Sequence, residues 1–326
     1  DETAVDANWP DRRPIGMLFT SAKLSESNPT GLFWDENLDA SDPDAVMQSA
    51  MAFADRSIEA MSAIDAQGAI VWDLEGTHLP IWYVGDPRML PILNPAMDAV
   101  ADAFFQRFRD AGLEVGITIR PTQVYFNETK DQWDHGTGSH SPDRNPLNES
   151  YDDIWPDGMR WWRFFPTVER MDRKIQYAKD RWGCRIFYID TNGATRMNRQ
   201  LGRLDWFILS ADIFRKLKER HPDILLIPEF FRAPSSKPNP PEQAGEVHLA
   251  YWGTSAPYRE LDLGGMGTPG FVRNTYPDAF SVVNITDGDM DGNREELIES
   301  VRNGDILLFR GWFNDFRNRK VQEIYE

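Results

Sequence analysis

Several short apolar segments of this sequence lead directly into acidic residues. The acids are Asp73, Glu75, Asp190, Glu229 and Asp287, and the segments before them are residues 69–72, 186–189, 224–228 and 280–285. An acid in such a place can cap the turn that follows. Carboxylates that gather together also raise one another's pKa, so a fold keeps such a group where a proton donor and an ionised partner are needed. Hydrolysis of a glycosidic bond needs this pair, one carboxyl group to protonate the leaving oxygen and one to act as nucleophile or base.

The apolar segments indicate which elements hold these acids. A short apolar run bounded by turn residues is typical of a strand buried on both faces, as in a parallel sheet. We predict strands at residues 15–20, 69–75, 115–119, 185–190, 224–229, 247–252, 280–285 and 306–309. Apolar residues at helical spacing predict helices at residues 43–61, 95–111, 168–182, 204–221 and 295–301.

The alternation of strands and helices predicts an α/β fold, a single (β/α)8 or TIM barrel over residues 15–326 after an N-terminal arm at 1–14. A doubly wound open sheet is the competing fold, but it normally has a glycine-rich turn after its first strand. Residues 21–24 of this chain read Ser-Ala-Lys-Leu instead, which favours the barrel. The helices after the fifth and sixth strands are degenerate. We expect the irregular stretches 121–165 and 254–278 to be long loops over the barrel mouth.

In a barrel the strand-end acids all lie around one mouth. An Asp after strand four, a Glu after strand five and an Asp after strand seven resemble the arrangement of the α-amylase-type retaining glycoside hydrolases. The resemblance covers three short segments and the alternation of strands and helices. It implies Asp190 as nucleophile, Glu229 as acid/base and Asp287 as a transition-state stabiliser that holds sugar hydroxyls. Tyr188 stands where that pattern has an Arg, two residues before the nucleophile, and no His precedes Asp287. The motifs do not identify a family within this group.

Further residues at the predicted mouth are candidates for substrate binding. Asp73 and Glu75 lie on the same face of their strand, where they either bind substrate or pair with Arg120. Arg120 and Arg310 end strands three and eight. Their guanidinium groups either hold a carboxylate or sulfate of an acidic glycan or neutralise the acids, and both roles stay open.

Aromatic and polar residues complete the expected carbohydrate site. The chain has 12 Trp, and several of them fall near strand ends or in the mouth loops. Flat aromatic faces pack against sugar rings, although core packing explains some of these residues equally well. We include Tyr188, Asn192 and Trp252 among the substrate-binding residues.

Metal and cofactor motifs are few. Asp287, Asp289 and Asp291 open a stretch that resembles an EF-hand loop, but the twelfth position is Ile298 instead of Glu. A Ca²⁺ ion, an acidic turn that caps the next helix, and a substrate contact by Asp287 remain alternatives there. The five His lack metal-ligand spacing, and no other cofactor is expected. The single cysteine, Cys184, excludes an internal disulfide and is expected to be a small buried residue.

The charge of the chain limits the classes of binding partner that we expect. A net charge of −17 and a pI near 4.8 argue against nucleic acid or an anionic membrane as the main partner. The chain does not begin with Met, so we expect a secreted or periplasmic protein whose signal was removed.

The sequence thus favours a retaining glycoside hydrolase acting on a poly- or oligosaccharide, acidic or sulfated glycans included. Two alternatives remain. One is a catalytically silent carbohydrate-binding barrel. The other is a metal-assisted hydrolase or lyase that uses the strand-end carboxylates as oxygen ligands.

Overall fold

The structure is a computed structural model of the 326-residue chain. It describes residues 9–20, 33–34, 37–72, 74, 85–121, 126–127, 132–133, 161–162, 168–190, 193–198, 203–208, 211–228, 280–285, 292–309 and 319–326.

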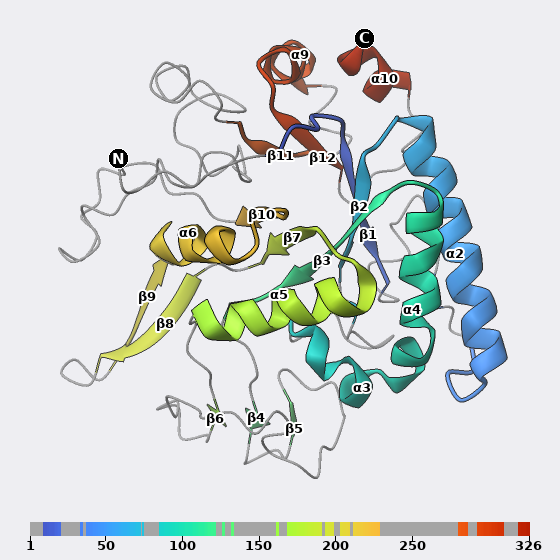
Figure 1. The fold of residues 1–326 in the computed structure, drawn as a ribbon, viewed down its shortest axis with the longest axis vertical. Coiled ribbons are helices and arrows are strands. Elements are labelled where there is room, and N and C mark those ends of the chain that lie inside the picture. The colour runs from blue at the N-terminus through green and yellow to red at the C-terminus, as the bar shows by residue number, and fades with distance from the viewer. Residues whose placement is uncertain are drawn as a thin grey trace.

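A parallel sheet forms the centre of the molecule (Figure 1). Its seven strands follow one another in the order β10-β7-β3-β2-β1-β12-β11. They are β1 (Ile15–Phe19), β2 (Gly68–Trp72), β3 (Glu114–Ile119), β7 (Ile186–Ile189), β10 (Leu225–Pro228), β11 (Val282–Ile285) and β12 (Ile306–Phe309). All seven coincide with predicted strands. The predicted strand at 247–252 lies outside the described residues.

The sheet curls into a nearly closed barrel. The first strand, β1, pairs with the second, β2, and also with the last, β12. β10 and β11 lie at opposite ends of the strand order, yet Ile227 of β10 and Val282 of β11 belong to one buried cluster with Ile15 of β1. Only a curved sheet brings these inward-facing residues into one interior. The parallel barrel is therefore confirmed, with seven of the eight predicted strands among the described residues.

Helices cover the outside of the barrel, as Figure 1 shows. They are α2 (Pro43–Ala63), α3 (Leu90–Leu93), α4 (Pro95–Asp110), α5 (Val168–Trp182), α6 (Ala211–Arg220), α9 (Arg294–Arg302) and α10 (Arg319–Tyr325), with a 3₁₀ turn η1 at Pro87–Met89. Asp42 caps α2 and Asn94 caps α4, each by accepting backbone N–H bonds of the first turn. The apolar faces of the helices pack on the outward side chains of the strands and make a second buried cluster, which includes Cys184. No described helix has the length and apolar character that a membrane span needs.

Two stretches differ from the prediction. Residues 204–208 were expected in a helix, but β9 (Arg203–Ile208) pairs antiparallel with β8 (Gly193–Asn198), and the described helix of that segment is α6. Leu204, Trp206 and Ile208 alternate with other residues, and this period of two suits a hairpin. Within 121–165, the short strands β4 (Phe126–Asn127), β5 (Gln132–Trp133) and β6 (Trp161–Trp162) form a small antiparallel sheet.

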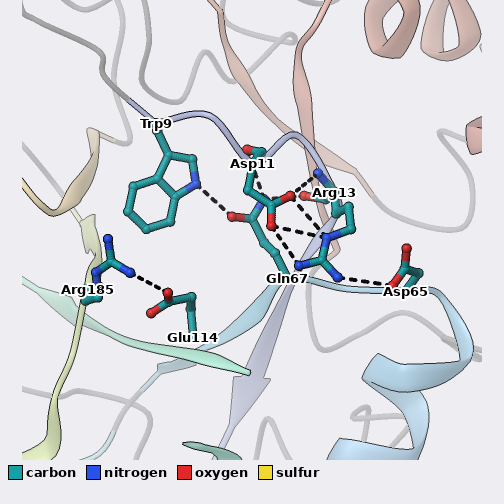
Figure 2. A network of polar contacts seen from close by, with 7 residues as sticks. All are labelled: Trp9, Asp11, Arg13, Asp65, Gln67, Glu114 and Arg185. Atoms are coloured by element: carbon teal, nitrogen blue, oxygen red, sulfur yellow. Dashed lines mark hydrogen bonds and ion pairs between the residues drawn. The ribbon is translucent and has the colours of Figure 1, made fainter. Parts of the chain in front are cut away.

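Trp9 closes the end of the barrel where the strands begin (Figure 2). Its ring joins the interior cluster, and its Nε1 donates to Gln67 Oε1 at 2.7 Å. Gln67 in turn donates to backbone carbonyls of the segment 11–13. The guanidinium of Arg185, which pairs with Glu114, lies 5.2 Å from the centroid of the Trp9 ring. The second half of the expected N-terminal arm thus packs against the barrel.

We predict that Trp9→Ala lowers the free energy of unfolding by about 3–5 kcal/mol, because it empties a large buried site at this end of the barrel. Urea unfolding followed by tryptophan fluorescence and circular dichroism measures the change. Trp9→Phe is the matched control, since it keeps an aromatic ring and loses the indole donor, and its effect should be clearly smaller. A Trp9→Ala protein as stable as wild type would contradict the packing described here.

Candidate functional site

The register of two neighbouring strands brings Arg120 and Asp190 together. β3 and β7 pair up to Ile119 and Ile189, and the N–H of Asp190 donates to the carbonyl of Ile119 at 2.9 Å. Arg120 is the residue after Ile119, and Asp190 is the residue after Ile189. Side chains alternate along a strand, so both continue the inward-facing rows of their strands at the carboxyl end of the sheet, where barrel enzymes have their active sites.

Arg120 and Asp190 form a buried ion pair. Arg120 Nε lies 2.6 Å from Asp190 Oδ2, and the two side chains are 14% and 5% exposed. A hydrogen bond between two charged groups is about twice as strong as a neutral one, and each group offsets the burial of the other. Among the roles left open for Arg120, the described residues thus show it neutralising a strand-end carboxylate. Binding of an acidic glycan by Arg120 stays a prediction.

Aromatic side chains make the layer of the barrel interior just below this pair. Tyr188 lies two residues before Asp190 and is fully buried, with its ring centroid 5.6 Å from that of Trp72. Trp72 also contacts Phe19 at 5.5 Å between centroids. Trp72 is only partly buried, whereas Tyr188 and Phe19 are fully buried. The prediction that Tyr188 contacts substrate remains untested.

A second group of buried charged residues contacts the backbone of Arg120. Lys174 of α5 and Asp86, which caps η1, have side chains that are 4% and 1% exposed, and their charged atoms are 3.7 Å apart. Arg88 adds two hydrogen bonds to the Asp86 carboxylate, at 2.9 and 2.7 Å. Burial would raise the pKa of Asp86, but the charge of Lys174 and the hydrogen bonds and charge of Arg88 outweigh it, so this pKa lies below its usual value.

The remaining predicted site residues lie outside the described residues. They are Asp73, Glu75, Asn192, Glu229, Trp252, Asp287 and Arg310, together with Asp289 and Asp291 of the calcium alternative. Of the predicted site, the structure therefore places Asp190, Arg120 and Tyr188. Within the described ranges, no three His, Cys, Asp or Glu side chains gather in a way that could hold a metal ion.

The buried charged group of Lys174, Asp86 and Arg88 was not predicted, although the sequence carried a signal for Lys174. Lys174 lies in the apolar stripe of α5, three or four residues from Met171 and Ala178. A lysine in such a stripe has a charge that needs a partner inside the protein. Asp86 and Arg88 gave no comparable signal, because their contacts depend on the path of a loop.

Comparisons with known proteins find only remote structural likenesses. No family model matches the sequence, and no curated protein matches it either. A noncanonic maltogenic α-amylase from Thermotoga neapolitana aligns at 9% identity over 66% of this chain and 45% of its own, with a TM-score of 0.35. An α-L-fucosidase, isoenzyme 1, from Paenibacillus thiaminolyticus aligns at 11% identity over 96% and 72%, with a TM-score of 0.40. A family GH13_31 enzyme aligns at 12% identity over 93% and 66%, with a TM-score of 0.41. At such low scores the likenesses say nothing about the activity of this chain, and its parallel barrel rests on strand order and register.

We predict that Asp86 gives the protein an acid-sensitive part of its stability. A carboxyl group with a lowered pKa in the folded state contributes stability that is present above its unfolded pKa, 3.8 in the reference scale, and is lost as the pH falls through the folded value. The difference in unfolding free energy between wild type and Asp86→Asn should therefore be constant above about pH 5 and shrink below about pH 4.

Urea unfolding at a series of pH values measures this difference. At neutral pH, Asp86→Asn should cost about 3–5 kcal/mol, because it leaves the buried Lys174 without its carboxylate. Asp110→Asn, a change at an exposed acid at the end of α4, is the control and should show little of either effect. A pH-independent difference for Asp86→Asn would contradict the prediction.

Proposed function

We propose that this protein is a retaining glycoside hydrolase that cleaves a poly- or oligosaccharide, with Asp190 as nucleophile and Glu229 as acid/base. The observation that supports it best is the buried ion pair of Asp190 with Arg120 at the carboxyl end of a parallel barrel. Such a carboxylate is shielded from water and held in one orientation, as a nucleophile for a sugar carbon needs to be.

The strand register supports the choice of Glu229 as the partner. β10 pairs with β7, with Pro228 opposite Ile189. Glu229 follows Pro228 in the sequence as Asp190 follows Ile189. The backbones of neighbouring strands lie about 4.8 Å apart, so carboxyl groups that extend side by side from them can reach the separation of about 5–5.5 Å found in retaining enzymes, whereas inverting enzymes need about 6.5–9.5 Å. Acids at adjacent strand ends therefore suit retention.

The reaction would run in two steps. Glu229 gives its proton to the glycosidic oxygen while an oxygen of Asp190 attacks the anomeric carbon, so the leaving sugar departs and a glycosyl ester forms. Because Asp190 Oδ2 accepts a hydrogen bond from Arg120, we assign the attack to Asp190 Oδ1. Glu229 then takes a proton from water, the water oxygen attacks the same carbon, and Asp190 leaves as a carboxylate. Asp287 would hold sugar hydroxyls, and Trp72 would offer a flat apolar face to a sugar ring.

We predict that Asp190→Asn and Glu229→Gln each lower hydrolysis by about 10³-fold or more while the circular dichroism spectrum stays that of a folded protein. Asp190→Asn also lowers the thermal midpoint, because it leaves the buried Arg120 without its carboxylate, so activity is measured well below the unfolding of each variant. The wild-type substrate is found first, by screening neutral and sulfated polysaccharides for new reducing ends. Asp223→Asn is a matched control, because Asp223 lies before the other end of β10 and pairs with Lys179 outside the barrel mouth. It should keep wild-type activity.

The outcomes separate the alternatives. Full activity in both variants would refute the catalytic pair, and binding of a polysaccharide without any cleavage would point to a silent carbohydrate-binding barrel. Loss of activity in chelator, restored by a divalent ion, would favour the metal-assisted reaction. Proton NMR of the first product anomer tests retention, since an inverted anomer would exclude Asp190 as a nucleophile.

A further inference from the structure

Arg120 lies one residue beyond the end of β3, and its main chain is held by two groups from outside the sheet. Its N–H donates to the carbonyl of Gly85 at 2.9 Å, and its own carbonyl accepts from Lys174 Nζ at 2.7 Å. Lys174 Nζ also lies 3.4 Å from the carbonyl of Gly85. The residue whose side chain holds Asp190 is thus fixed on both sides of its backbone.

The loop before η1 is shaped for this contact. Gly85 has a φ of +70°, a conformation that residues with a side chain rarely adopt. A Cβ at this position would lie 2.6 Å from the backbone nitrogen of Arg120, so only glycine lets the loop lie this close. Asp86, the next residue, provides the negative charge beside Lys174.

The position of Lys174 also connects this contact with Asp190 itself. α5 ends at Trp182, and the chain continues almost directly into β7, which delivers Asp190. The single segment from α5 to the end of β7 therefore carries two groups that contact Arg120. The ammonium group of Lys174 donates a hydrogen bond to the Arg120 backbone, and the carboxylate of Asp190 accepts one from the Arg120 side chain. A buried ammonium group is costly unless it is compensated, and Asp86 supplies the compensation.

We propose that Lys174 is a positioning residue, which sets the orientation of Asp190 by fixing the backbone of Arg120. Its catalytic consequence rests on the function proposed above. The geometric part, a coupling between Lys174 and Asp190 through Arg120, stands on the contacts alone. The competing explanation is that Lys174 only joins α5 to the neighbouring loop and matters for stability.

Lys218 provides a matched control for this distinction. It is also a buried lysine on a helix that leads into a barrel strand, and its Nζ donates to two backbone carbonyls, of Pro222 at 3.0 Å and Ile224 at 2.6 Å. These carbonyls lie before β10, at the end of the barrel opposite Asp190. Lys174→Met and Lys218→Met therefore remove the same kind of group at opposite ends.

The kinetic test uses the polysaccharide found in the screen, at a temperature well below the unfolding of each variant. We expect Lys174→Met to lower kcat by about tenfold or more with KM changed less than about twofold, because a misplaced nucleophile slows the chemical step more than it weakens binding. Lys174→Arg should recover part of kcat, and Lys218→Met should keep it. Equal kcat values for Lys174→Met and Lys218→Met would overturn the proposal.

A thermal double-mutant cycle tests the coupling without any substrate. Asp190→Asn is introduced into wild type, Lys174→Met and Lys218→Met, and the shift in thermal midpoint that it causes is compared. We expect this shift to be clearly smaller in the Lys174→Met background and unchanged in the Lys218→Met background. The same shift in all three would refute the coupling. If wild type cleaves no polysaccharide, the proposed function fails, while the cycle still decides whether Lys174 positions Asp190.

Discussion

The pairing of the first strand with the last determines the rest of this structure. β1 lies between β2 and β12, so the first and last strands lie side by side, and residues of β1, β10 and β11 share one buried cluster because the sheet bends around an interior. Side chains of each strand then divide into an inward row and an outward row, and the two rows make separate buried clusters. The curvature also gathers the carboxyl ends of the strands at one mouth, so residues far apart in sequence, such as Arg120 and Asp190, lie in contact.

The two ends of the barrel are closed by different physical means. Where the strands begin, Trp9 packs into the interior. Its indole N–H donates to Gln67, which donates to backbone carbonyls of residues 11 and 13. Where the strands end, two buried cations each face a carboxylate. Arg120 faces Asp190, and Lys174 faces Asp86. Removing one member of such a pair costs about 3–5 kcal/mol, so the mouth tolerates little change in its charges.

The strands could be predicted because each is a continuous apolar run, and this signal depends only on neighbouring residues. Asp190 could be proposed for the same reason, since it ends such a run. Its pairing with Arg120 could not, because it depends on the register of β3 against β7, across an intervening segment of more than sixty residues. Residues 204–208 were predicted wrongly, since five residues before a true helix read equally well as its first turn or as a strand.

The departure from the α-amylase-type pattern has a physical explanation in the register. That pattern has an arginine two residues before the nucleophile, a position that faces the interior one layer below Asp190. In this chain Tyr188 fills the position without any exposed surface, and its ring packs against Trp72. An arginine at this position would lose the contact between the Tyr188 and Trp72 rings. Arg120 stands level with Asp190 on the neighbouring strand, so the counter-charge comes from the residue that follows β3, and the layer below holds uncharged side chains such as Tyr188 and Thr118.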